Sequence, residues 1–294
     1  MRTFSAFLRE LFRSLLVFLL ASAIIYALIV YSPGARHRSS EQRGEDKVSS
    51  TLAYFTWVKN LILYRDLGET TIGGKEVLSE LISKGKNSLF MIGFALISSG
   101  LLSLMFIGLS SRLSRLSLLP ATTKVLPYLL SALPAFIVGA FLIHRFPGLK
   151  YPFSQFKEVP VWPYYLVPAC ILGIADGFLS EMIRYAKEEI EKAAGENYLL
   201  LAKAKGARLW SHLKYDFITH ISQLVFSKVA LLISGTVILE YMFSLPGIGA
   251  LAFTAAEGHD MNLLLGTLVL LVFFVILFNF FNRLILVAID PRVR

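Results

Sequence analysis

Six stretches of the sequence are long and apolar enough, or nearly so, to cross a membrane as helices. They are Leu11–Tyr31, Leu89–Leu109, Val125–Ile143, Tyr164–Met182, Leu224–Tyr241 and Leu263–Val287. A spanning helix needs about 20 mostly apolar residues. Inside the bilayer, a segment of this kind satisfies its own backbone polar groups only as a helix. The sequence therefore predicts an all-α, polytopic membrane protein with about six transmembrane helices.

The composition agrees with a membrane protein. Of the 294 residues, 55% are apolar, only 17% are charged and 23 are phenylalanine, which is more apolar than a typical soluble domain. The single cysteine, Cys170, lies inside an apolar segment, so no disulfide can form within the chain. The net charge of +9 is explained by basic loops on the cytoplasmic side of a membrane. Nucleic acid is therefore not an expected partner.

Basic residues predict that both termini are cytoplasmic. With the N-terminus inside, sixteen Lys or Arg residues lie in short inner loops and span flanks: Arg2, Arg9, Arg13, Arg112, Arg115, Lys124, seven between Arg184 and Lys214, Arg283, Arg292 and Arg294. The short outer loops carry few, as the positive-inside rule requires. The first apolar segment is long for a signal-peptide core and has no A-x-A cleavage pattern after it, so we expect it to be retained.

The chain divides into three predicted parts. Residues 1–31 hold the first spanning helix, residues 32–88 form an extracytoplasmic loop, and residues 89–294 form a five-helix transmembrane domain. The loop begins with a polar run typical of a linker and becomes amphipathic over residues 52–68. Its aromatic residues suit either a helix lying at the membrane surface or a helix packed on the bundle. Both alternatives stay open from the sequence.

Two charged residues are predicted to lie within the bilayer. Asp176 falls near the middle of the fourth segment and Lys228 in the inner third of the fifth. Ionised groups at such depth cost about 2.5–3.5 kcal/mol, so they normally face a bundle interior or a watery cavity. Counting along antiparallel helices places both at similar depth, and we expect that they pair or line a translocation path. The alternative is that Lys228 snorkels to the interface while Asp176 bonds a neighbouring helix.

Patterns of nucleotide sites and of enzymes are weak in this chain. GETTIGGKE at 68–76 has the wrong glycine spacing for a phosphate-binding loop, and GIGALA at 247–252 follows a proline and leads into a span. No metal-ligand spacing relates the five histidines, which are His37, His144, His212, His220 and His259. No serine lies in a G-x-S-x-G turn. We therefore predict no catalytic site and no metal site, and do not expect an enzyme.

A basic, helix-patterned block, Glu196–Phe217, separates the fourth and fifth segments. Good helix formers run up to Lys205, and Gly206 then permits a left-handed or sharply turned backbone. An apolar stripe follows at four-residue spacing: Leu209, Leu213, Phe217 and Ile221. The pattern predicts a helix, a turn and a second helix on the cytoplasmic face. Such a unit suits either anionic lipid or a groove on a partner protein.

Part of this block resembles a motif of a known family. The pattern E-x-Y-x-x-x-A-x-A-K-G is matched by Glu196, Tyr198, Ala202, Ala204, Lys205 and Gly206. It is typical of the permease subunits of binding-protein-dependent ABC importers, in the oligopeptide and dipeptide branch that also includes nickel permeases. The resemblance implies a cytoplasmic coupling loop at about residues 184–222, which docks on an ATPase subunit through these residues together with Leu209 and Leu213.

Further motifs similar to those of the family follow in the expected order. The pattern G-x-x-x-x-E-x-x-F-x-x-P-G-[LI]-G is matched by Gly235, Glu240, Phe243, Pro246, Gly247, Ile248 and Gly249, and the terminal D-P-R-x-R by Asp290–Arg294. In the first half, Arg65–Gly68 is similar to G-D-L-G, with Arg65 in place of the first glycine. The chain departs from the family at residues 216–220, where DFITH replaces H-x-L-x-N.

The resemblance implies the transmembrane domain of a type I ABC importer in a bacterial inner membrane. The chain would form half of a translocation pathway for peptides, nickel or a similar small solute. Path or gate residues would be Asp176, Lys228, Glu240, Pro246, Gly247 and Gly249. Implied partners are a second permease subunit, two ATPase subunits that hold ATP and magnesium, an extracytoplasmic solute-binding protein and membrane lipid, with no cofactor in this chain. An ion-coupled secondary transporter and a non-transport membrane scaffold are the alternatives.

Overall fold

The structure, a computed structural model, describes residues 2–31, 50–71, 74–113, 120–150, 162–195 and 209–289. Within these ranges the chain is helical, with one isolated bridge between Glu69 and Glu76 and no β-sheet. The predicted all-α class is therefore confirmed.

Several helices are long and apolar enough to cross a membrane. The stretches that qualify alone are Phe7–Val30 of α1 (Arg2–Val30), Val77–Leu109 of α4 (Val77–Leu113) and Met261–Leu284 of α12 (Met261–Ile289). Two bent helix pairs qualify if each is one span. By length and composition, the described residues thus supply three to five spans. The fifth predicted span, Leu224–Tyr241, lies inside a longer helix, α10 (Leu209–Met242).

Two of the predicted spans are broken near their middles. The third consists of α5 (Pro120–Ser131) and α6 (Ala135–Arg145), which meet at 82°. Its break contains Pro134, which has no backbone N–H to continue a helix. The fourth consists of α7 (Trp162–Ile174) and α8 (Phe178–Gly195), which meet at 56°. Its break contains Asp176 and Gly177 with φ of 53° and 77°, in the left-handed region.

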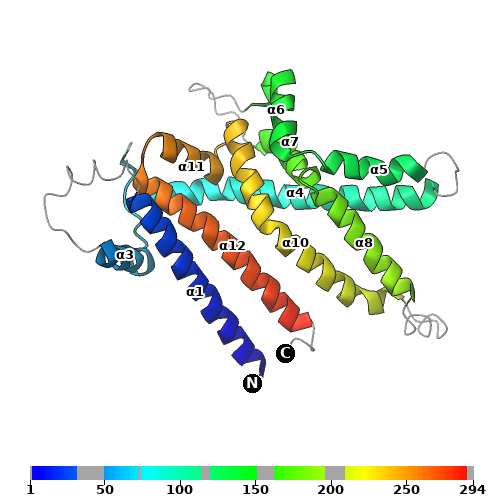
Figure 1. The fold of residues 1–294 in the computed structure, drawn as a ribbon, viewed down its shortest axis with the longest axis horizontal. Helices are drawn as coiled ribbons and strands as arrows, with labels where there is room; N and C mark the ends of the chain where they lie inside the picture. The colour runs from blue at the N-terminus through cyan, green and yellow to red at the C-terminus, as the bar shows by residue number, and fades with distance from the viewer. Residues whose placement is uncertain are drawn as a thin grey trace.

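Figure 1 shows α8, α10, α12 and α1 side by side, with α4 running across them. The start of α1 lies against the end of α12, where the Arg283 guanidinium pairs with the Glu10 carboxylate at 2.8 Å and the Phe7 and Phe280 rings are 5.8 Å apart. The main core lies among α4, α7, α8 and α10, and its largest buried side chains include Tyr165, Phe178, Phe243, Met91 and Leu232. Large apolar side chains on the outer face of α1 are exposed, as expected for a surface that meets lipid.

A helix lies within the loop that the sequence predicts to be on the outer side. It forms α3 (Ser50–Lys59), followed by a π-helical turn, η1 (Asn60–Tyr64). The Tyr54 hydroxyl donates to the Leu19 carbonyl of α1 at 2.9 Å and lies 2.9 Å from the Ser22 hydroxyl. Phe55 and Tyr64 stay about two-thirds exposed, at 64% and 69%. The helix therefore packs on α1 and also presents aromatic side chains outward.

Candidate functional site

The predicted coupling residues lie at the edge of the described chain. Glu196, Tyr198, Ala202, Ala204, Lys205 and Gly206 are outside the described residues. On one side of them α8 ends at Gly195, and on the other α10 begins at Leu209 and contains Leu213. The second helix of the predicted helix-turn-helix is therefore the first part of α10, which continues without interruption to Met242.

At the other end of α10, Glu240 is completely buried. Its Oε1 accepts a hydrogen bond from the Ser88 hydroxyl of α4 at 2.7 Å, and its Oε2 accepts one from the Gly249 N–H at 2.8 Å. The Ser88 hydroxyl in turn accepts from the Ile248 N–H at 2.9 Å. Ile248 and Gly249 begin α11 (Ile248–Glu257). Their N–H groups have no partner within that helix, so the buried carboxylate and Ser88 together satisfy its first turn.

The two glycines of the turn are required by close contacts. A Cβ atom on Gly247 would lie 2.0 Å from the Glu240 Cδ, and one on Gly249 would lie 2.2 Å from the Val237 Cα. Nearby, the Asn87 amide donates to the Pro246 carbonyl at 2.7 Å. Glu240, Pro246, Gly247 and Gly249 thus form one cluster, here called the Glu240 cluster, which fastens the α10–α11 turn to α4. A role of this cluster in gating stays a prediction.

The Glu240→Gln variant is expected to lower the free energy of unfolding by roughly 1–3 kcal/mol. A carboxylate can accept from both Ser88 and Gly249, whereas the amide turns an NH₂ donor toward one of these donors. A lower Tm of the purified protein in detergent measures the loss. Glu257→Gln is the matched control, because Glu257 is exposed and accepts from the Tyr241 hydroxyl. An equal Tm drop in both variants would contradict this account of the cluster.

The structure gives the two predicted intramembrane charges separate partners. The Lys228 ammonium pairs with the Glu181 carboxylate of α8 at 2.8 Å. The Asp176 Oδ1 accepts from the Ala135 N–H at the start of α6, at 3.1 Å. Asp176 and Lys228 therefore do not pair, and Asp176 bonds a neighbouring helix as in the alternative, although Lys228 forms an ion pair within the bundle. The cause is the break at Asp176, since depths counted along a straight helix do not hold across a 56° bend. That the two residues line a translocation path stays a prediction.

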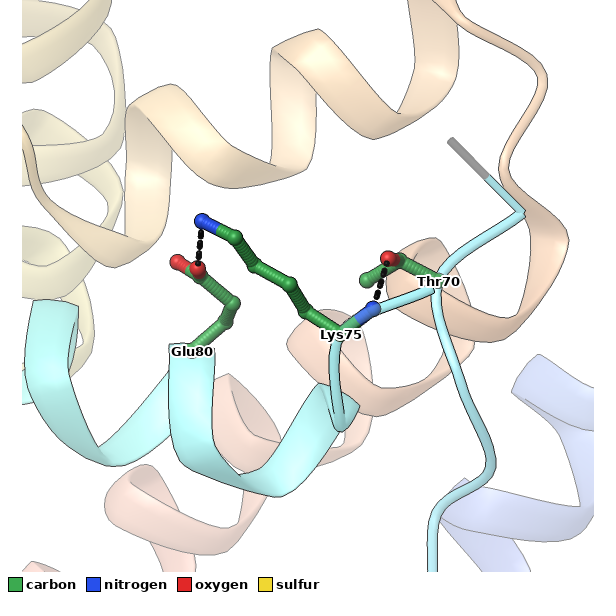
Figure 2. Close-up of polar contacts among 3 residues, drawn as sticks. All are labelled: Thr70, Lys75 and Glu80. Atoms are coloured by element: carbon green, nitrogen blue, oxygen red, sulfur yellow. Dashed lines mark hydrogen bonds and ion pairs between the residues drawn. The ribbon is translucent and has the colours of Figure 1, made fainter. Parts of the chain in front are cut away.

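The described residues of the GETTIGGKE segment, 68–71 and 74–76, pair with each other across a turn just before α4 begins at Val77. In Figure 2, the Lys75 N–H donates to the Thr70 hydroxyl at 3.1 Å and the Lys75 ammonium pairs with Glu80 at 2.9 Å. The Thr71 N–H donates to the Asp260 carboxylate between α11 and α12 at 2.8 Å. Just before this turn, Arg65 has φ of 53°, where the family pattern has a glycine that adopts such angles without strain.

Sequence patterns missed three partners in these contacts: Ser88, Asn87 and Glu181. Asn87 and Ser88 are polar neighbours at the start of the second predicted span, and Glu181 is a second acidic residue in the fourth. Polar groups at such positions were a signal, because they normally find partners inside the bundle. Among the residues that the structure describes, no group of three or more His, Cys, Asp or Glu side chains is placed to hold a metal ion.

Comparison with known proteins agrees with the motifs. Residues 104–294 match the family model described as "Binding-protein-dependent transport system inner membrane component". The dipeptide transport system permease protein DppB of Bacillus subtilis (strain 168) is 22% identical over 82% of this chain and 78% of its own length. The glutathione transport system permease protein GsiC of Shigella flexneri serotype 5b is 26% identical over 55% of this chain and 53% of its own length.

The family match covers both the coupling motif and the Glu240 cluster, and it extends over well more than half of the chain. Together with the apolar helices, it makes the chain a multi-pass membrane protein and a transport component. The chain belongs to the family of binding-protein-dependent transport system inner membrane components.

Proposed function

We propose that this chain forms half of the translocation pathway of an ATP-driven importer and that the imported solute is a short peptide. The observation that carries the proposal is that one helix, α10, begins beside the coupling motif and ends in the Glu240 cluster. The names of relatives, which transport dipeptides and glutathione, support the peptide class. The other half of the pathway is a second, homologous permease subunit.

Residues 196–206 act in this proposal as the coupling segment, together with Leu209 and Leu213. An ATPase subunit that binds this segment acts on both α8 and α10, because the two helices flank it. Two ATPase subunits hold ATP and magnesium, and a solute-binding protein delivers the solute on the outer side. Both termini are cytoplasmic in this arrangement, as the basic residues indicate.

The proposed path residues fall into two groups. The Glu240 cluster borders the path at the outer end of α10. Lys228 and its partner Glu181 form the other group, where α8 packs on α10. The side chains of Lys228 and Glu181 are 22% and 31% exposed in the single chain. An ion pair with this exposure can face a hydrated passage without an isolated charge in the bilayer.

The proposal is tested by purifying the complex through a tag on this chain and reconstituting it in liposomes with its binding protein. We expect two ATPase subunits and a second permease subunit to co-purify. Uptake of a radiolabelled dipeptide or of glutathione should require ATP, and an ATPase subunit with a defective catalytic residue should reduce it to background. Uptake that persists without ATP hydrolysis and follows an ion gradient would overturn the proposal.

A further inference from the structure

The two broken spans are joined at their breaks by three hydrogen bonds. The Gly177 N–H donates to the Ser131 carbonyl at the end of α5, at 2.7 Å, and the Asp176 N–H donates to the Leu133 carbonyl at 3.2 Å. In return, the Asp176 carboxylate accepts from the Ala135 N–H at the start of α6. We call this set of contacts the clasp. Each break thereby satisfies backbone groups that the other leaves open.

Asp176 supplies a contact that α6 cannot make for itself. The residue before α6 is Pro134, whose side chain makes no capping hydrogen bond. The first N–H groups of a helix need acceptors from outside the helix, and an unsatisfied backbone group is costly where water is excluded. Asp176 therefore acts as a cap contributed by a different span.

The clasp lies between two pairs of half-helices. In Figure 1, α6 and α7 lie together on one side of it, while α5 and α8 extend away on the other. Contacts join α6 to α7 and α5 to α8. A little beyond the clasp, the Glu181–Lys228 ion pair ties α8 to α10. The two helices that flank the proposed coupling segment are thus linked to each other, and the start of α6 is bonded to Asp176, two residues before α8 begins.

We propose that Asp176 is a positioning residue for transport and that its carboxylate makes α6 follow the movement of α8. The inference rests on the proposed function, in which the coupling segment moves α8 and α10. Asp176 and Gly177 of the clasp have left-handed backbone angles, as suits a hinge that absorbs a change in direction. In this role the hydrogen-bond acceptor of Asp176 matters and its negative charge does not.

Two substitutions at position 176 separate the acceptor from the charge. Asn keeps the side-chain oxygen and tolerates the left-handed backbone, but has no charge. Gly accepts the same backbone angles and removes the oxygen. Ala135→Pro removes the donor from the other side of the bond. Proline suits the first position of a helix, and Pro134 already has the extended backbone (φ −61°, ψ 136°) that a following proline requires.

The experiment uses the reconstituted complex and measures the ratio of dipeptide imported to ATP hydrolysed. Asp176→Gly and Ala135→Pro are each expected to lower this ratio roughly tenfold, on the scale of one lost buried hydrogen bond. ATP hydrolysis and assembly should be retained, and Asp176→Asn should keep a ratio close to that of the unmodified protein. In a Cys170→Ser background, spin labels at positions 141 on α6 and 184 on α8 should give a broader distance distribution with glycine than with asparagine.

Three outcomes would overturn the inference. An equal loss with Asp176→Asn would show that the charge matters, an unchanged ratio with Ala135→Pro would show that the bond is not needed, and equal distance distributions would show that α6 is not held by it. If the complex with Asp176→Gly does not assemble, the transport ratio of the Ala135→Pro complex still tests the inference. Absence of ATP-dependent uptake by the unmodified complex would instead refute the proposed function.

Discussion

Replacement of Gly249 by valine is expected to prevent the chain from accumulating as a folded protein. A Cβ atom at this position would lie 2.2 Å from the Val237 Cα and 2.8 Å from the Val237 carbonyl oxygen, both backbone atoms of α10. A backbone cannot move aside as a flexible side chain can, so the cost reaches or exceeds the upper end of the roughly 1–3 kcal/mol typical of overpacking. Separation of α10 from α11 would also break the Gly249–Glu240 bond, which adds about 1–3 kcal/mol.

Size-exclusion chromatography of a fluorescent fusion in detergent measures this effect as the loss of a monodisperse peak. Gly93→Val is the matched control. Gly93 is also a helical glycine, in α4, but a Cβ atom there would meet nothing within 4 Å. We expect the control to accumulate normally. Normal accumulation of Gly249→Val would show that α10 and α11 do not approach as closely as described.

Replacement of Ala202 by glutamate is expected to abolish coupling to ATP hydrolysis while the chain still folds. In the proposed docking site, the new carboxylate would be buried without a partner, and a buried unpaired charge costs about 2–5 kcal/mol at an interface. Binding of the ATPase subunit should therefore weaken by at least about thirtyfold. Co-purification of ATPase subunits and ATP-dependent uptake are the measurements. Gly206→Pro should have a similar effect, because proline cannot adopt a left-handed turn.

Ala202→Ser is the control for the coupling prediction, since it adds only a small, uncharged hydroxyl group at the same position. It should retain ATPase subunits and uptake. If Ala202→Glu also retained both, the resemblance of residues 196–206 to the coupling motif would have no functional meaning in this chain.

Hydropathy was sufficient to locate the helices, but it did not show where they break. Hydropathy averaged over about 20 residues does not respond to a single Pro134 or Asp176, so each predicted span was drawn as continuous. The local signals were present: a proline in one segment and an Asp-Gly pair, a common turn dipeptide, in the other. What the sequence does not contain is the relation between the breaks, because Asp176 and Ala135 bond only after both spans have folded.

The Glu240 cluster was likewise only partly predictable from the sequence. The motif that contains Glu240, Gly247 and Gly249 was evident from the sequence. The structure explains the two glycines, because a Cβ atom on either would overlap with atoms of α10. Its partner Ser88 lies 152 residues away in the chain, and no local pattern relates residues at such a separation. Lys228 was paired with the wrong acidic residue for a related reason, since depth along a span is a one-dimensional measure and the chain bends by 56° between α7 and α8, before it reaches Glu181.

The unbroken helix α10 has a consequence for how this chain can vary in length. It contains 34 residues, or roughly 51 Å of rigid rod at 1.5 Å per residue, and each residue turns the chain by about 100°. One residue inserted between Leu209 and Glu240 would therefore rotate one end of the rod about 100° against the other, whereas seven would leave them within about 20°. The direction in which Leu209 faces is consequently fixed relative to the direction in which Glu240 faces, and this angular relation is here called the phase. Insertions that shift this phase should be much rarer than insertions in the predicted outer loop, residues 32–88.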